Sequence, residues 1–219
     1  GLKKEKAVLI SQAFSVDFLS LFTIDLLPRI TSVRGNLFLN YYFTYKFFGI
    51  FLAIIHLNIM RLSSQIIVMH KLMQNQVGFF TSKKPVIIPN FINEKALSKY
   101  FNSKIDNSKP IKFVFVGSLN HRKNPLLLLK TFAIISKSFD SRLHFLGDGP
   151  LLKKLKSFIK ANKYLKNKVF VHGFQRNPYS KMNDSDLLVL PSFSEGTSRA
   201  ALESLFLGVP CILRNVDSN

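Results

Sequence analysis

The chain has 219 residues, 47% of them hydrophobic, which is enough for the core of one large or two small domains. Basic side chains outnumber acidic ones by 31 to 12, about equally in both halves, which excludes a basic tail. An even excess of this kind serves solubility or attracts polyanions, and we expect an anionic membrane surface before a nucleic acid. The single cysteine, Cys211, excludes an internal disulfide and a thiolate metal cluster and fits a reducing compartment.

The first half of the chain predicts part of an α/β domain. Short apolar runs at 7–10, 65–69 and 86–88 are typical of strands, and a long region rich in phenylalanine and tyrosine, 36–62, is typical of helix. The polar segment 91–110 lacks periodicity and is predicted to be a linker. The sequence opens with Gly rather than Met and stops directly after a predicted strand, so we expect a piece of a longer protein.

The second half alternates clearly between strand and helix. Asn124 is expected to cap a helix that has Pro125 in its first turn. Strands are predicted at 111–116, 142–146, 168–171, 186–190 and 210–213, and helices at 125–139, 150–164, 178–184 and 198–207. Such alternation predicts a parallel sheet that binds ligands at the carboxyl ends of its strands. Those ends lie at Gly117, Gly147, Gly173 and Pro191.

The segment 194–203, Ser-Glu-Gly-Thr-Ser-Arg-Ala-Ala-Leu-Glu, places two carboxylates eight positions apart around a predicted helix start. A helix N-terminus carries free N–H groups and a partial positive charge, so it suits a phosphate. Glu195 and Glu203 can then contact polar groups on either side of that anion, which is a layout for a sugar nucleotide. Two plainer interpretations stay open: a loop carboxylate beside the helix dipole for Glu195, and an exposed helix glutamate for Glu203.

A second loop, 117–125, reads Gly-Ser-Leu-Asn-His-Arg-Lys-Asn-Pro and follows a predicted strand. Gly117 lets a ligand approach the backbone, and Lys123 brings a positive charge to the next helix start. Alone, this loop is equally typical of an exposed basic turn. Together with the segment 194–203 it favours an anion site.

These two segments, in this order, resemble those of the retaining GT-B glycosyltransferases of family 4. The resemblance covers 111–217 with ordered motifs and is weaker over 1–100, where Val86-Ile87-Ile88-Pro89-Asn90 is similar to the end of the family's acceptor domain. It implies an α/β, GT-B-like fold. In that fold 1–90 is a partial acceptor-side α/β domain, 91–110 a linker, and 111–219 a Rossmann-like, parallel-sheet domain that binds the nucleotide-sugar donor and is truncated at its C-terminus.

The resemblance also implies site residues. Lys123 would neutralise the departing diphosphate and Glu195 would contact the transferred sugar, which makes these two the implied catalytic residues. Glu203 would hold the ribose hydroxyls. Ser118 stands where the family has an arginine, and Arg122 or Arg199 is a candidate substitute. The implied donor-binding residues are Gly117, Ser118, Arg122, Lys123, Gly173, Phe174, Glu195, Gly196, Thr197, Ser198 and Glu203.

Other candidate motifs are weaker. Asp184-Ser185-Asp186 imitates an Asp-x-Asp metal motif, but it precedes its strand on the side opposite the carboxyl end, so we expect structural capping and no metal. His56 and His70 lie in apolar settings and are predicted to be core or surface histidines rather than general bases. No Gly-x-Gly-x-x-Gly occurs, which disfavours a dinucleotide oxidoreductase, and no cofactor is expected besides the donor substrate.

The predicted function is metal-independent transfer of a hexosyl-type sugar, with retention, from a nucleoside-diphosphate sugar, UDP-linked by preference. The acceptor would be a glycan or lipid-linked molecule in bacterial surface polysaccharide or lipopolysaccharide synthesis. The basic surface predicts a cytoplasmic enzyme, peripheral at the inner face of the cell membrane. With an incomplete acceptor side, the piece alone is expected to be inactive. The alternatives are a non-catalytic nucleotide-sugar-binding module or pseudoenzyme, which Ser118 favours, and a nucleic-acid-binding protein, for which no stacking platform or recognition helix is evident.

Overall fold

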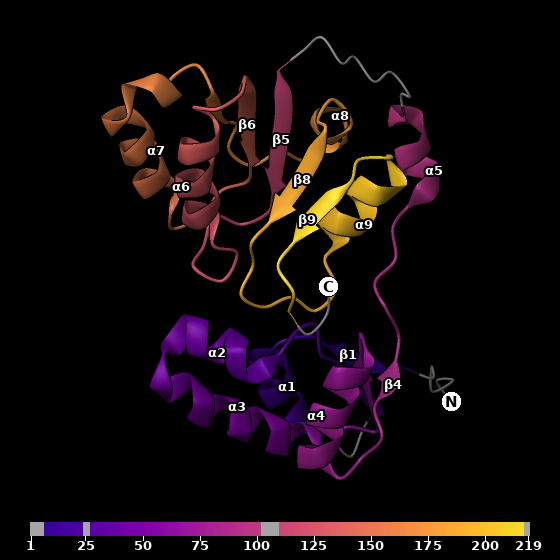
Figure 1. The fold of residues 1–219 in the computed structure, drawn as a ribbon. Coiled ribbons are helices and arrows are strands. Elements are labelled where there is room, and N and C mark those ends of the chain that lie inside the picture. Colours follow the sequence, from indigo (N-terminus) through magenta and orange to yellow (C-terminus); the bar gives the residue numbers. More distant parts are fainter. Residues whose placement is uncertain (1–6, 24–26, 102–109, 217–219) are drawn as a thin grey trace. The chain divides into compact units, whose positions relative to one another are not determined.

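The computed structural model of the chain describes residues 7–23, 27–101 and 110–216. These residues form two compact units (Figure 1). The N-terminal unit contains the described residues up to Asn90 together with 194–197, and the C-terminal unit contains 91–193 together with the described residues from Ser198. Within the described ranges, no helix combines the length and the apolar character needed to cross a lipid bilayer.

The N-terminal unit is built on a parallel sheet with the strand order β1-β2-β3-β4. Helical segments connect each strand to the next, as parallel strands require, and α3 contacts α1, α2 and α4. The strands are β1 (Leu9–Ser11), β2 (Arg29–Ser32), β3 (Gln65–Val68) and β4 (Val86–Ile87). The helices are α1 (Phe14–Leu19), followed by the 3₁₀ turn η1 (Ser20–Thr23), then α2 (Leu37–Tyr45), α3 (Phe47–Met60) and α4 (Lys71–Thr81).

Two local features shape the α2–α3 pair. The side chain of Asn36 accepts a hydrogen bond from the backbone N–H of Leu39 at 3.1 Å and so caps α2. Lys46 has a φ of 57°, in the left-handed region, and this residue separates α2 from α3. The predicted helical region 36–62 is therefore two helices, because one residue with a positive φ interrupts the helical hydrogen bonds.

The predicted strands at 7–10, 65–69 and 86–88 are confirmed as β1, β3 and β4. Strand β2 is absent from the prediction, because its inward side chains are Arg29 and Thr31, 2% and 1% exposed. A strand that buries its polar residues does not show the apolar alternation by which strands are recognised. The helices α1 and α4 were likewise not predicted.

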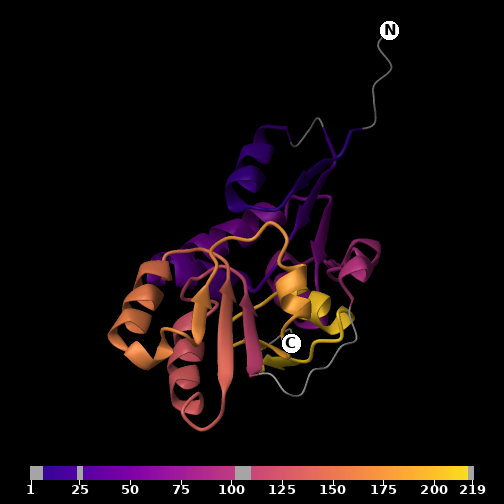
Figure 2. The same ribbon diagram turned by 90° about the horizontal axis from the view of Figure 1, so that it is seen from above.

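The C-terminal unit contains a five-stranded parallel sheet with the order β7-β6-β5-β8-β9. Right-handed crossovers place α6 and α7 on one face of this sheet and α8 and α9 on the other (Figures 1 and 2). The strands are β5 (Ile111–Val116), β6 (Ser141–Leu146), β7 (Val169–Val171), β8 (Leu187–Leu190) and β9 (Cys211–Leu213). The helices are α6 (Pro125–Ile135), α7 (Leu152–Ala161) with the 3₁₀ turn η3 (Lys163–Leu165), α8 (Tyr179–Asn183) and α9 (Arg199–Phe206).

These elements confirm the alternation predicted for the second half of the chain. The central strands are buried on both faces, so Val114, Phe115, Leu143 and Phe145 are all 0% exposed. One detail was wrong: Asn124 has a φ of 51° and its side chain makes no capping hydrogen bond, although Pro125 does begin α6.

The segment 91–110 is predicted to be a linker, but its first part forms regular structure. Residues 94–97 form α5 (Glu94–Leu97) and the next three form the 3₁₀ turn η2 (Ser98–Tyr100). The side chain of Asn93 caps α5 by accepting from the N–H of Ala96 at 3.0 Å, and Leu97, 1% exposed, joins the core of the C-terminal unit. One buried leucine among polar residues leaves no periodic pattern, which explains the error. Residues 102–109 lie outside the described residues.

Candidate active site

The carboxyl ends of β5, β6 and β7 meet backbone to backbone. The N–H of Gly117 donates to the carbonyl of Leu146 at 3.0 Å, and the N–H of Gly147 donates to the carbonyl of Gly173 at 2.8 Å. A Cβ on Gly147 would lie 1.9 Å from the carbonyl oxygen of Gly117, and both glycines have a φ of 150°. Only glycine fits this approach, so the predicted strand-end glycines form one continuous edge.

Lys123 lies along this edge. A Cβ on Gly117 would be 3.7 Å from Cε of Lys123, so the lysine side chain runs back over the end of β5. Its backbone is fixed by the turn before α6, where the N–H of Lys123 donates to Oδ1 of Asn120 at 2.9 Å. The turn therefore carries a positive charge to the carboxyl edge of the sheet.

The loop after β8 joins the loop after β5. The N–H of Phe193 donates to the carbonyl of Arg122 at 2.8 Å. Ser198 then caps α9, its hydroxyl accepting from the N–H of Ala201 at 3.4 Å. Strands β5 and β8 are neighbours from which the chain continues in opposite directions, which is the position where open α/β sheets bind ligands. The N-terminal end of α9 follows β8 at this position.

Glu203 lies in α9 and is half-buried, so the interpretation as an exposed helix glutamate is wrong. One carboxylate oxygen accepts a hydrogen bond from the hydroxyl of Tyr179 in α8 at 3.4 Å. Burial raises the pKa of Glu203, while Arg199 and the Tyr179 hydrogen bond oppose this shift. Burial, with the neighbouring carboxylate second, also raises the pKa of Tyr179. The pair can offer both an acceptor and a donor to a hydroxyl-bearing ligand.

The loop 194–197 belongs to the N-terminal unit. The carbonyl of Thr197 accepts a hydrogen bond from the side-chain amide of Asn90 at 2.7 Å, and a Cβ on Gly196 would lie 2.5 Å from the carbonyl of Arg34. Glu195 in this loop is 6% exposed. Three of the predicted site residues, Glu195, Gly196 and Thr197, therefore lie in the N-terminal unit. The other eight lie in the C-terminal unit.

The remaining predicted residues lie at the rims of the loops. Ser118 is exposed, and its hydroxyl accepts from the amide of Asn120 at 3.2 Å. Phe174 is 76% exposed and follows Gly173, which has a φ of 71°. An exposed ring beside a strand end can stack on a planar group.

Asp184 and Asp186 both contact Lys112, at the edge of the sheet opposite the carboxyl ends of the strands. The carboxylate of Asp186 accepts from the backbone N–H of Lys112 at 2.7 Å, and that of Asp184 pairs with Nζ of Lys112 at 2.8 Å. Burial raises the pKa of Asp184, but Lys112 outweighs this effect and the net shift is downward. These contacts tie β5 to the start of β8, which is a structural role.

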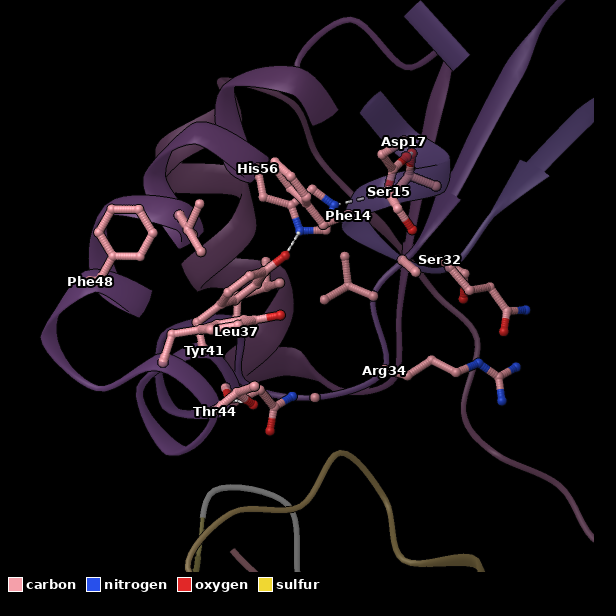
Figure 3. A pocket seen from close by; sticks show the side chains of 18 residues that line it. Phe14, Ser15, Asp17, Ser32, Arg34, Leu37, Tyr41, Thr44, Phe48 and His56 are labelled. Carbon is pink, nitrogen blue, oxygen red and sulfur yellow. Dashed lines mark hydrogen bonds and ion pairs between the residues drawn. The ribbon is translucent and has the colours of Figure 1, made fainter. Parts of the chain in front are cut away.

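The N-terminal unit contains a pocket of about 580 Å³ that the sequence did not indicate (Figure 3). At its inner end, Asp17 accepts a hydrogen bond from Nε2 of His56 at 2.8 Å, and Nδ1 of His56 lies 2.8 Å from the hydroxyl of Tyr41. His56 was predicted to be a core or surface histidine, and it is buried, but as the centre of a polar chain. Asp17, an acidic residue in the mostly apolar segment 14–19, is a signal in the sequence that could have indicated this pocket.

The family model described as "Glycosyl transferases group 1" matches residues 83–219. An Escherichia coli UDP-Gal:alpha-D-GlcNAc-diphosphoundecaprenol alpha-1,3-galactosyltransferase is 32% identical over 143 residues, which are 61% of this chain and 37% of that protein. The O-antigen biosynthesis glycosyltransferase WclY of Escherichia coli is 28% identical over 193 residues, 85% of this chain and 54% of that protein.

Among solved structures, HepE of Anabaena in complex with UDP and glucose superposes with a TM-score of 0.71 at 15% identity, covering 93% of this chain and 58% of HepE. This similarity shows the α/β fold of the GT-B glycosyltransferases. The chain spans about half or less of the length of the two curated relatives. The family match covers more than half of the chain, and the chain therefore belongs to the glycosyl transferases group 1.

Proposed function

We propose that the C-terminal unit binds the diphosphate of a nucleotide sugar and that the whole protein transfers the sugar with retention. One observation carries this proposal: Lys123 lies over Gly117 at the strand edge next to β8, the strand that leads into α9. Negative charge grows on the diphosphate as the bond to the sugar breaks. A fixed lysine and a helix N-terminus stabilise that charge without a metal ion.

The other residues take roles around this anion. Glu203, with Tyr179 beside it, binds the ribose hydroxyls, and Phe174 and Gly173 contact the nucleobase. Glu195 contacts the transferred sugar. A uridine nucleotide is supported by the name of the galactosyltransferase relative and by the UDP bound to HepE.

The acceptor is a lipid-linked glycan of bacterial surface-polysaccharide synthesis. Two relatives support this: one is named for a diphosphoundecaprenol acceptor and the other for O-antigen biosynthesis. We place the enzyme in the cytoplasm at the inner face of the membrane. The net charge of +19 and three phenylalanines of α3, Phe47, Phe48 and Phe51, at 79%, 62% and 58% exposed, support contact with anionic lipid.

Calorimetric titration of the chain with UDP and UDP-sugars tests the donor site. Lys123→Ala is expected to weaken UDP binding by about tenfold or more, the effect of losing one charge-assisted contact. Glu203→Gln should weaken binding of UDP and spare that of inorganic diphosphate. The matched control is Lys154→Ala, which removes a lysine from the exposed face of α7. If Lys123→Ala and Lys154→Ala bind UDP with equal affinity, the proposal is wrong.

A non-catalytic nucleotide-sugar-binding module is the second candidate, because exposed Ser118 stands at the family's arginine position. Both candidates bind UDP-sugar, so activity separates them. The longer protein should transfer sugar to a lipid-linked acceptor, and Glu195→Ala should abolish the transfer. Donor binding without turnover in that protein would favour the binding module.

A further inference from the structure

The strands on both sides of β8 lead into basic residues. In the sheet of the C-terminal unit, β8 lies between β5 and β9, and all three strands are parallel (Figure 1). Lys123 lies in the turn that joins β5 to α6, and Arg214 is the first residue after β9. Both cations therefore follow strands that end at the same carboxyl edge, one on each side of the strand that leads into α9.

Backbone hydrogen bonds fix Arg214 beside the end of β8. Its N–H donates to the carbonyl of Leu190, the last residue of β8, at 3.2 Å. Three residues further along that chain, the N–H of Phe193 donates to the carbonyl of Arg122 in the turn after β5 at 2.8 Å. The segment 190–193 is therefore bonded to Arg214 at one end and to the Lys123 turn at the other.

The side chain of Arg214 lies over the ring of Phe193. Its guanidinium carbon is 4.5 Å from the ring centroid, which is a cation–π contact. The ring is 38% exposed and Arg214 is exposed, so the contact holds a positive charge at the surface of this edge. An arginine that stacks on an aromatic ring can still pair with phosphate oxygens through its fork of N–H donors.

Lys123 alone does not balance a diphosphate. A nucleoside diphosphate carries more than one negative charge, and further charge develops as the sugar leaves. Ser118, exposed at the end of β5, adds none. Burial raises the pKa of both Glu203 and Tyr179, and the charge of Arg199 opposes both shifts, so Arg199 acts on the pair assigned to the ribose. The diphosphate needs another cation.

We propose that Arg214 is the second cation of the donor site and pairs with the diphosphate from the side opposite Lys123. Phe193 is the residue that positions it. The inference rests on the proposed function, in which the diphosphate lies at the N-terminal end of α9. The charge that grows on the departing diphosphate is then shared between two fixed cations, one from each neighbour of β8.

Calorimetric titration of the chain with UDP and with inorganic diphosphate tests this assignment. Arg214→Gln keeps a long polar side chain and removes the charge, so both ligands should bind about tenfold more weakly, the effect of one lost charge-assisted contact. The two losses should be equal, because the proposed contact is to the diphosphate alone. Arg214→Lys keeps a charge without the planar fork and should recover part of the affinity.

Two further variants separate contact with the ligand from a defect of the fold. Phe193→Leu keeps an apolar side chain and removes the cation–π contact, so UDP binding should weaken about twofold to fivefold. In the Arg214→Gln background the same replacement should cost no further affinity, and an equal loss in both backgrounds would show that the ring does not act through Arg214. Arg142→Gln is the matched control, because Arg142 is exposed near the start of β6 at the opposite edge of the sheet. It should bind UDP as the natural chain does.

Titration of Lys123→Ala beside these variants separates this inference from the proposed function. If Lys123→Ala weakens UDP binding while Arg214→Gln binds as tightly as Arg142→Gln, the donor site stands and the inference is overturned. Weaker UDP binding by Arg214→Gln with unchanged binding of inorganic diphosphate overturns it as well. If the natural chain binds neither ligand, the proposed function fails and this inference fails with it.

Discussion

Gly147 is the residue at which backbone contact in the candidate site is closest. Alanine there needs a φ of 150° and a Cβ 1.9 Å from the carbonyl oxygen of Gly117. Gly147→Ala is expected to lower the free energy of unfolding by about 2 kcal/mol or more, from strain and separation of the loops. Urea denaturation measures this loss, and UDP titration should show weaker binding.

Gly173→Ala is the matched control for that prediction. Its φ is 71°, but no atom lies within 4 Å of the added Cβ, so only the conformational cost of about 1 kcal/mol applies. A loss as large as that of Gly147→Ala would show that the close contact between the two loops is unimportant.

Asp17 should make stability depend on pH. Its pKa in the folded protein lies below the ordinary value of 3.8, so its contribution is present above that value and is lost as the pH falls through the folded pKa. Asp17→Asn is expected to be less stable than the natural chain near pH 7, and the difference should shrink in acid. Chemical denaturation between pH 7 and pH 3 measures it; a constant difference would contradict the ionised carboxylate.

Helices α2 and α3 pack closely at a glycine. A Cβ on Gly49 would lie 2.2 Å from the carbonyl oxygen of Tyr41, so Gly49→Ala must push the helices apart. We expect a loss of about 1–3 kcal/mol of stability, because the two helices must separate to admit the added methyl group. Thermal unfolding measures this loss. Asn58→Ala, on the exposed side of α3, is the control, because alanine raises helix propensity at both positions and only Gly49→Ala disturbs the helix contact. An equal loss of stability in the two variants would contradict the packing argument.

The elements of the C-terminal unit were predictable because each carries its own signal. Strand β5 ends in four consecutive apolar residues, 113–116, of which the first three are buried, and α7 separates leucines from lysines on opposite faces. The N-terminal unit departs from those signals. In β2 the inward residues are Arg29 and Thr31, and between α2 and α3 the break depends on the φ of Lys46, which no residue pattern reveals.

The residues of the strand-edge site and those of the N-terminal pocket differ in how far the sequence predicts that they lie together. Gly117 and Lys123 are six residues apart in the single turn that joins β5 to α6, which makes their proximity predictable. Asp17, Tyr41 and His56 come from three helices, so only the tertiary fold unites them. The sequence predicted His56 as a core or surface residue because it shows the apolar neighbours of a histidine along the helix and not its partner across the fold.

The charge and the exposed aromatic residues of the molecule together predict membrane binding. Replacing Phe47, Phe48 and Phe51 by serine should lower binding to vesicles that contain anionic phosphatidylglycerol by about tenfold or more, since each ring loses apolar burial. Added salt should weaken the binding of both proteins, because the net charge of +19 is unchanged. Vesicle co-sedimentation measures the binding. Serine at Phe79 and Phe91, 82% and 83% exposed but outside α3, is the control. If both sets of replacements reduce vesicle binding equally, any exposed ring contributes to binding, and the proposal that α3 is the membrane contact is wrong.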